Sequence, residues 1–192
     1  MGKLFELISD EALEKESEKF DYSICDVCGE ECETYRYKGT QYDEEGNALD
    51  NSYDSYAVCA DCILAGSVTH ICDFEYIERI DDYFAHTGLN AEEKESIRER
   101  LIEKYQRTPD IPGFMQGEDR PLCCNDITEF TGHPENDEEL YEISEYNYWE
   151  KGLKAKPEYY DFRKYGRPES YSDIAAFQCA HCGKRYFTFQ FT

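Results

Sequence analysis

Three Cys-x-x-Cys pairs set the strongest constraint on how this chain can fold. Four further cysteines accompany them, so the sequence holds ten in all. A two-residue spacer in a tight turn lets both thiolates face one metal ion at about 2.3 Å. A closed tetrahedral site needs two such pairs, so an ion would join segments that lie far apart in the sequence. The three pairs are Cys25 and Cys28, Cys59 and Cys62, and Cys179 and Cys182.

The composition indicates why such a chain needs cross-links. Leu, Ile, Val and Phe together form about 19% of the 192 residues, and the formal net charge is −23. Chains with less than about 20% of these residues and a high net charge tend to stay disordered. Seventeen tyrosines add amphipathic area to the fold. We therefore expect a modest apolar core that metal ions or disulfides reinforce.

The excess of negative charge also bears on partners and on location. Nucleic acids and anionic membranes repel an acidic surface, so we expect neither as a partner, and we expect a protein partner with a basic surface. The first twenty residues lack the apolar run of a secretory signal, and no stretch reaches the length of a membrane helix. We therefore expect a cytoplasmic protein, where reduced cysteines bind metal rather than form disulfides.

The apolar pattern and the cysteine pairs together predict a small, irregular α+β fold that zinc staples, with zinc-ribbon-like knuckles and short antiparallel hairpins. An N-terminal helix is expected within residues 1–20, because leucine and isoleucine recur at helical spacing over 3–19. Residues 21–192 are expected to form a single zinc-binding domain. Its acidic, tyrosine-rich stretch at about 134–172 resembles a flexible insert.

Local signals place several elements inside this domain. A β-hairpin should occupy much of 29–58, with Tyr35 and Tyr37 on one face of its first strand. Asn90 should cap a helix over residues 91–105. The last segment should form a strand, a knuckle and a strand, with aromatic side chains alternating onto one face at Phe187, Phe189 and Phe191.

The first two cysteine pairs form the most economical metal site. Cys25 and Cys28 would meet Cys59 and Cys62, since a hairpin over 29–58 would return the chain to its start. The glycine after Cys28 permits the tight turn of a knuckle. The alternative is four reduced thiols inside a small core. We expect one zinc ion at this site.

The last pair needs partners from elsewhere in the chain. Cys123 and Cys124 are the obvious candidates to join Cys179 and Cys182, although adjacent cysteines bind one ion with more strain than a spaced pair. A second zinc site therefore stays open at this point. Cys32 and His133 are reserve ligands, whereas Cys72 is better explained as a buried core thiol. The remaining histidines are expected to be structural or exposed: His70, His86 and His181.

The same motifs weigh against several classes of enzyme. Sites with four sulfur ligands are closed, so they stabilise a fold rather than catalyse a reaction. The sequence has no His-Glu-x-x-His, no glycine-rich phosphate loop and no Gly-x-Ser-x-Gly. An enzyme remains the alternative, with polar groups on the loop at 107–126 forming its site: Arg107, Gln116, Glu118 and Asp126.

An ordered series of motifs resembles one protein family. The series reads CDVC, YRYKGTQY, CADCILAGS, RTPDIPGFMQ, CCND followed by EFTG, and FQCAHCGK. It is similar to the CbrC family of small bacterial proteins, which is named after a colicin-tolerance phenotype. The resemblance covers about 22–133 and 174–185. It implies a part in stress or toxin tolerance, and it brings no catalytic reaction. The acidic surface and the amphipathic tyrosines favour a cytoplasmic binding or interaction protein.

The resemblance also implies particular site residues. Its ligands would be Cys25, Cys28, Cys59, Cys62, Cys124, Cys179 and Cys182, and its loop residues Arg107, Thr108, Pro109, Gly113 and Gln116. This chain departs from the family where the pattern runs roughly His-Cys-Gly-Asp-x-Cys. Thr128 stands at the last cysteine and cannot replace a thiolate, so Cys123 would have to supply the missing ligand.

Overall fold

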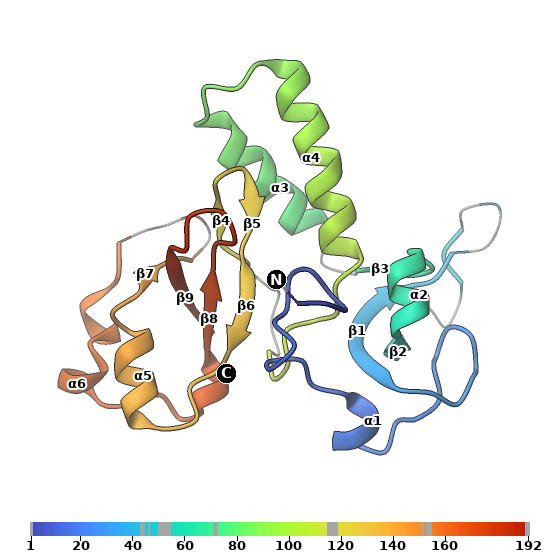
Figure 1. The fold of residues 1–192 in the computed structure, drawn as a ribbon, viewed down its shortest axis with the longest axis horizontal. Coiled ribbons are helices and arrows are strands. Elements are labelled where there is room, and N and C mark those ends of the chain that lie inside the picture. The colour runs from blue at the N-terminus through green and yellow to red at the C-terminus, as the bar shows by residue number, and fades with distance from the viewer. Residues whose placement is uncertain are drawn as a thin grey trace.

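The computed structural model describes residues 2–42, 45, 47–49, 55–70, 73–114, 119–150, 152 and 155–190. Two lobes that contain β-sheets lie side by side, and a helical hairpin stands above the line between them (Figure 1). The mixture of helices with short, mostly antiparallel sheets confirms the predicted irregular α+β class.

The first lobe is a three-stranded antiparallel sheet in the order β2-β1-β3. β1 (Thr34–Thr40) pairs with β2 (Ser55–Cys59) and β3 (Thr69–His70), and α2 (Ala60–Ala65) directly follows β2. The predicted hairpin is therefore present. Tyr35 and Tyr37 are both buried, and they form a small core with Val58 and Ile63.

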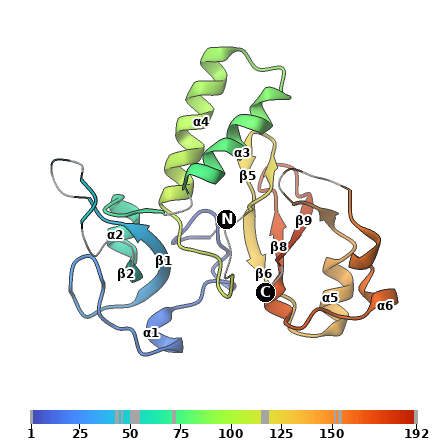
Figure 2. The ribbon, with the colours of Figure 1, turned by 180° about the vertical axis from the view of Figure 1, so that it is seen from behind.

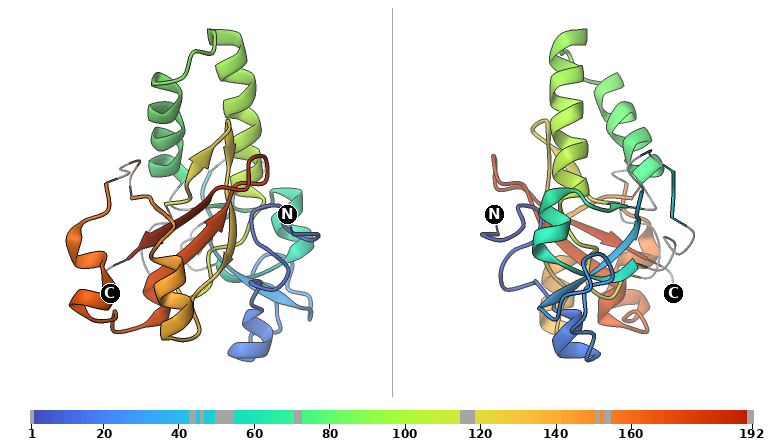
Figure 3. Two further views of the ribbon diagram at one scale, coloured as in Figure 1. Left: turned by 60° about the vertical axis from the view of Figure 1, so that its left-hand side comes forward. Right: turned by 90° about the vertical axis from the view of Figure 1, so that its right-hand side faces the viewer.

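The helical hairpin consists of α3 (Asp73–Ala85) and α4 (Ala91–Gln106), which pack against each other (Figure 3). Asn90 accepts a hydrogen bond from the Glu93 N–H, while the Glu93 carboxylate accepts one from the Asn90 N–H. This capping box confirms the predicted start of the second helix. Sequence analysis missed α3. Within the described residues, no helix is long and apolar enough to cross a bilayer.

The second lobe is a four-stranded sheet in the order β6-β8-β9-β7, beside a two-stranded hairpin. β8 (Ile174–Gln178) and β9 (Arg185–Phe189) form the predicted strand, knuckle and strand. They pair with β6 (Glu129–Gly132) and with β7 (Asn147–Tyr148), and the small hairpin is β4 (Leu122–Cys123) with β5 (Asp126–Ile127). Tyr186 and Phe187 enter different core clusters on the two faces of β9, and Phe189 packs with Phe187. Phe191 lies outside the described residues.

The acidic stretch at 134–172 is built into this lobe, so the expected flexible insert is corrected. Its described residues form short elements: α5 (Asp137–Ile143), η2 (Glu158–Tyr160), α6 (Phe162–Tyr165) and η3 (Tyr171–Asp173). Leu140, Tyr160 and Phe162 are buried against Phe187 of the sheet. Tyr160 of this stretch thus serves as a core residue of the lobe.

The predicted N-terminal helix is wrong for most of its length. Only α1 (Glu16–Lys19) is helical within residues 2–20. Ile8 instead forms a parallel bridge with Phe130 of β6. Phe5 belongs to the core of the first lobe, whereas Leu7 belongs to that of the second. The segment therefore runs between the lobes through turns and one β-bridge, and it joins them (Figure 2).

Candidate metal centres

The first knuckle turns two cysteine sulfurs towards the same place. The N–H of Gly29 donates to the Cys25 carbonyl at 2.8 Å, and the φ of Gly29 is +73°. Glycine adopts that backbone conformation without strain. The N–H groups of Val27 and Cys59 lie 3.4 and 3.3 Å from the Cys25 sulfur. Such contacts stabilise a thiolate, which is the form that binds metal.

The second half of this centre comes from the end of β2. Cys59 is the last residue of the strand and occupies the N-cap position of α2, while Cys62 lies in the first turn of that helix. All four sulfurs lie within 4.8 Å of one another, and those of Cys28 and Cys59 are 3.9 Å apart. A tetrahedron with metal–sulfur bonds of about 2.3 Å has edges of about 3.8 Å. The group therefore fits one ion.

The second centre begins with two adjacent cysteines. Cys123 ends β4, and the turn into β5 is formed by Cys124 and Asn125, whose φ angles are +55° and +59°. Two positive φ angles in a two-residue loop are typical of a type I′ hairpin turn. In this turn, the Cys123 and Cys124 sulfurs are 3.8 Å apart. The turn thus places the sulfurs of two adjacent cysteines close enough to bind one ion.

The last knuckle completes this second group. Between β8 and β9, the N–H of Gly183 donates to the Cys179 carbonyl at 2.9 Å, and the φ of Gly183 is +70°. The Cys123 and Cys182 sulfurs are 3.6 Å apart, and all four sulfurs lie within 4.8 Å of one another. The eight predicted cysteines are thus brought together as two groups of four, called here the first tetrad (residues 25, 28, 59 and 62) and the second tetrad (residues 123, 124, 179 and 182).

The reserve ligands are not members of either tetrad, although Cys32 borders the first one, where it packs against the core cluster that contains Cys25 and Cys59. The Cys32 thiol donates to the Glu30 carbonyl at 3.4 Å. Both ring nitrogens of His133 lie 2.6 Å from carbonyl oxygens, those of Ile174 and Pro112. Cys72 lies outside the described residues. Neither reserve ligand is needed, because Cys123 completes the second tetrad.

Crowded thiols favour a bound cation. Burial, followed by the neighbouring thiols, raises the pKa of Cys123 to about 12, although the Tyr186 hydroxyl donates to its sulfur. Burial also raises the pKa of Cys62 far above its usual value. The N–H of Lys184 lowers the pKa of Cys182 to about 7. A metal ion supplies the positive charge that allows all four thiols of a tetrad to ionise.

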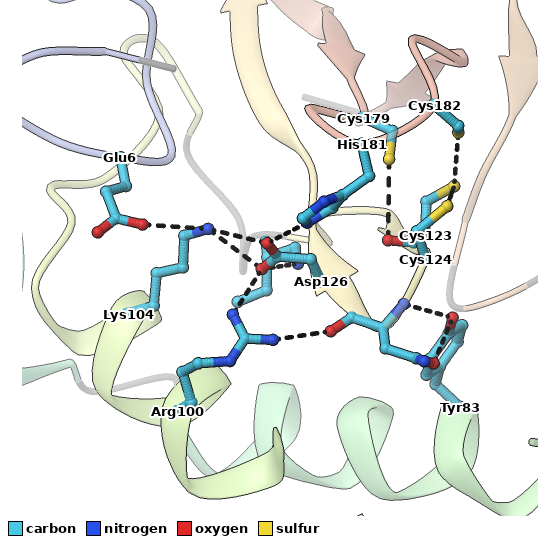
Figure 4. A network of polar contacts seen from close by, with 12 residues as sticks. Glu6, Tyr83, Arg100, Lys104, Cys123, Cys124, Asp126, Cys179, His181 and Cys182 are labelled. Atoms are coloured by element: carbon cyan, nitrogen blue, oxygen red, sulfur yellow. Dashed lines mark hydrogen bonds and ion pairs between the residues drawn. The ribbon is translucent and has the colours of Figure 1, made fainter. Parts of the chain in front are cut away.

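A buried carboxylate anchors the second tetrad to the helical hairpin (Figure 4). Asp126 receives hydrogen bonds from the His181 ring at 2.8 Å and the Lys104 ammonium at 3.1 Å. Burial alone would raise the pKa of Asp126, but the hydrogen bond from His181 and the charge of Lys104 lower it. The Lys104 ammonium also lies 3.2 Å from a Glu6 carboxylate oxygen. The expected exposure of His181 is confirmed, since its side chain is 54% exposed.

Contacts to the hairpin turn extend this anchor. The Asn125 N–H donates to the Tyr83 hydroxyl at 3.1 Å, and Arg100 donates to the Asn125 carbonyl at 3.0 Å. Helices α3 and α4 therefore hold the backbone beside Cys124. The sequence analysis did not predict these contacts. The one residue that could have indicated them is Asp126, which follows Cys124 by two residues.

Comparisons place these centres in a family. A family model described as an uncharacterised protein family, UPF0167, matches residues 8–191. The chain belongs to this family. The matched range contains both tetrads and the loop at 107–126. No curated protein and no solved structure matches the chain.

The described residues of the candidate functional loop in this UPF0167 chain make contacts that stabilise the fold. Arg107 forms an ion pair with Glu103 at 2.9 Å, and the buried Thr108 hydroxyl donates to the Lys104 carbonyl at 2.8 Å. Both contacts close the end of α4. Asp126 serves the anchor described above. Gln116 and Glu118 lie outside the described residues, so their predicted role is untested.

Proposed function

We propose that this chain is a zinc-binding protein of the CbrC type, with one structural zinc ion in each tetrad. The observation that carries the proposal is the pair of four-sulfur groups, in each of which all the sulfurs lie within 4.8 Å of one another and neighbouring sulfurs come as close as 3.6 to 3.9 Å. Tetrahedral sites with four sulfurs suit zinc or iron, and zinc sites of this kind are common in reduced compartments.

The tetrads are proposed as structural because each closes a separate part of the fold. The first joins a knuckle to the end of β2 and the start of α2. The second joins the β4–β5 turn to the β8–β9 turn, which are far apart in sequence. Four sulfurs leave no coordination position for substrate. Metal binding would therefore contribute free energy to folding, because neither group forms in the unfolded chain.

For the protein as a whole, we favour a binding or interaction role with a basic protein partner. The net charge of −23 and the exposed aromatic side chains support this choice. A part in toxin or stress tolerance rests on the family resemblance alone. The enzyme alternative is weaker, because Arg107, Thr108 and Asp126 are engaged in closing helix and turn contacts.

Elemental analysis of protein purified without added metal tests the zinc proposal. We expect two equivalents of zinc per chain. A thiol reagent should then find at most two of the ten cysteines reactive in the native protein, and all ten after unfolding with a chelator. Less than half an equivalent of zinc, together with ten free thiols in the native protein, would refute the proposal. Iron in place of zinc would refute the choice of metal while leaving the sites.

A further inference from the structure

A surface groove lies beside the first tetrad. It has a volume of about 400 Å³ and runs between the segment that leads into the first knuckle and strand β2. Its side-chain walls include Asp21, Tyr22, Ile24, Asp26 and Tyr56. None of these residues was singled out by the cysteine pattern, and none is needed to complete a tetrad.

Three large side chains with apolar area line the groove and are exposed to solvent. Tyr22 is 53% exposed, Ile24 60% and Tyr56 38%. Phe20 lies next to this wall, with its ring centroid 6.3 Å from that of Tyr22. Large apolar side chains that gather at one exposed place mark an interaction site more often than scattered ones do. Tyrosine suits such a site, since it offers both apolar area and a hydroxyl.

Carboxylates border the same groove. Asp26 uses one oxygen, Oδ2, to accept from the N–H groups of Tyr56 and Ala57 at 2.7 and 2.9 Å, which fixes the side chain in place. The exposed Asp21 carboxylate has no hydrogen-bond or ion-pair partner among the described residues. Residues 16–33 carry seven Asp or Glu against one Lys. Four thiolates around a divalent ion would add further negative charge.

The negative charge around the groove favours some binding partners over others. A nucleic acid or an anionic membrane would be repelled, and so would a second copy of a chain whose net charge is −23. A positively charged side chain is favoured at such a place twice over, by the carboxylates and by the face of the Tyr22 ring. The Tyr56 ring already has the Arg36 guanidinium 5.2 Å from its centroid. An apolar side chain of the same segment would cover Ile24.

We propose that this groove docks a basic segment of a partner protein that alternates Lys or Arg with apolar residues. The inference deepens the proposed function and rests on it, because Ile24 and Asp26 adjoin Cys25 and are held by the first knuckle. Docking therefore requires the ion of the first tetrad. Loss of that ion would release the knuckle and remove one wall of the groove.

Amide NMR of the zinc-loaded, ¹⁵N-labelled full chain tests the proposal directly. The probe is a short synthetic peptide of alternating Arg and Lys with one Tyr and one Leu, and its partner control has Glu at every basic position. We expect saturable shifts of amides at 20–26 and 55–57 with the basic peptide and none with the acidic one. Shifts spread evenly over the acidic surface, or equal shifts with spermidine, would overturn the docking of a polypeptide at this groove.

Variants sharpen this test. Tyr22→Ser and Asp21→Asn should each weaken peptide binding about tenfold or more. Asn tolerates the positive φ of residue 21, which is 60°, so the second change should leave the backbone intact. The matched control is Tyr159→Ser with Tyr165→Ser in the other lobe, where the two tyrosines are 52% and 51% exposed. Equal binding by all of these proteins would refute the groove.

The zinc content of the same samples separates the two proposals. A chain that holds two zinc ions and binds no peptide at residues 20–26 refutes the groove and leaves the metal centres standing. A folded chain without zinc that still binds the peptide refutes the coupling and the structural zinc together.

Discussion

The His181 ring nitrogen Nε2 lies 2.8 Å from a carboxylate oxygen of Asp126, and this contact joins two turns that both supply ligands to the second tetrad. His181 lies between Cys179 and Cys182, and Asp126 follows Cys124 by two residues. Lys104 of α4 binds the same carboxylate from the other side. Helix and tetrad are thus coupled through one buried acid.

Replacement of Asp126 by Ala should be far more harmful than replacement of His181 by Ala. Asp126→Ala leaves Lys104 largely buried without its main partner, and breaking a buried pair costs about 3–5 kcal/mol. His181 is half-exposed, so His181→Ala should cost less than about 1 kcal/mol. Chemical denaturation at fixed zinc concentration measures both. Equal losses would show that the carboxylate does not anchor the helix.

Single cysteine variants should distinguish ligands from bystanders within one short segment. Cys28→Ser removes a sulfur of the first tetrad, so we expect about one zinc equivalent to be lost and the melting temperature to fall sharply. Cys32→Ser is the matched control and should keep both ions. Metal analysis and thermal melting check the pair. Similar zinc contents in the two variants would count against the first tetrad.

Cys123→Ser tests whether Cys123 is the fourth ligand of the second tetrad. The family pattern has a cysteine where this chain has Thr128, so another residue must supply that ligand. We expect this variant to lose the second ion and to keep the first, because the tetrads draw on separate segments. Native mass spectrometry counts the ions in each molecule. Retention of both ions would mean that another group completes the second site.

Asp110, which belongs to neither tetrad, should make the stability of the fold depend on pH. Its buried carboxylate lies 3.2 Å from the His70 ring and 3.9 Å from the Arg36 guanidinium, and it accepts from the Lys38 N–H at 3.0 Å. Burial alone would raise the pKa of Asp110, but His70, Lys38 and Arg36 lower it below its usual value. A lowered pKa in the folded state stabilises the fold above the unfolded pKa, and this stabilisation is lost as pH falls through the folded value.

The corresponding experiment compares the wild type with Asp110→Asn. At neutral pH the variant should be less stable by about 3 kcal/mol, since it removes the negative charge beside the largely buried Arg36 guanidinium. The difference should begin to narrow below about pH 4, where the carboxyl of the unfolded chain takes up a proton, and should keep narrowing until the folded carboxyl is protonated at a lower pH. Acid release of metal affects both proteins, so the difference between them isolates Asp110. A gap that stays constant down to about pH 2 would contradict the account.

The N-terminal segment offers a test of the corrected fold. Leu7 is fully buried in the core of the second lobe, whereas Leu4 is 38% exposed. Leu7→Ala should cost about 2–5 kcal/mol, and Leu4→Ala should cost less than about 0.5 kcal/mol. Denaturant titrations give both values. Comparable losses would favour an amphipathic helix over a segment that joins the lobes.

Sequence reasoning succeeded where the signal was local. A spaced cysteine pair followed by glycine forms a knuckle by its own backbone geometry, and Asn90 with Glu93 forms a capping box within one turn. The grouping of Cys123 with Cys179 could also be predicted from the sequence, because few cysteines were left to pair. The contact of Asp126 with His181 was not, because it depends on how two distant turns face each other.

The errors arose where distant contacts decide the structure. The apolar residues of 3–19 follow helical spacing, yet the segment pairs with β6 instead: the Leu7 carbonyl accepts from the Phe130 N–H, and the Ser9 N–H donates to the Phe130 carbonyl. Helix α3 was missed although Tyr76, Ile80 and Phe84 are spaced to line one face, and all three are buried. Tyr160 lies in the stretch predicted to be a flexible insert, but it packs against Tyr148 and Phe189.

X-ray absorption at the zinc edge tests the central claim most directly. The spectrum of the purified chain should fit a single shell of four sulfur neighbours at about 2.3 Å, with two zinc ions per molecule. Such a result would establish two closed four-sulfur centres. A shell that needs nitrogen or oxygen neighbours at about 2.0–2.1 Å, or a folded protein without zinc, would contradict the account.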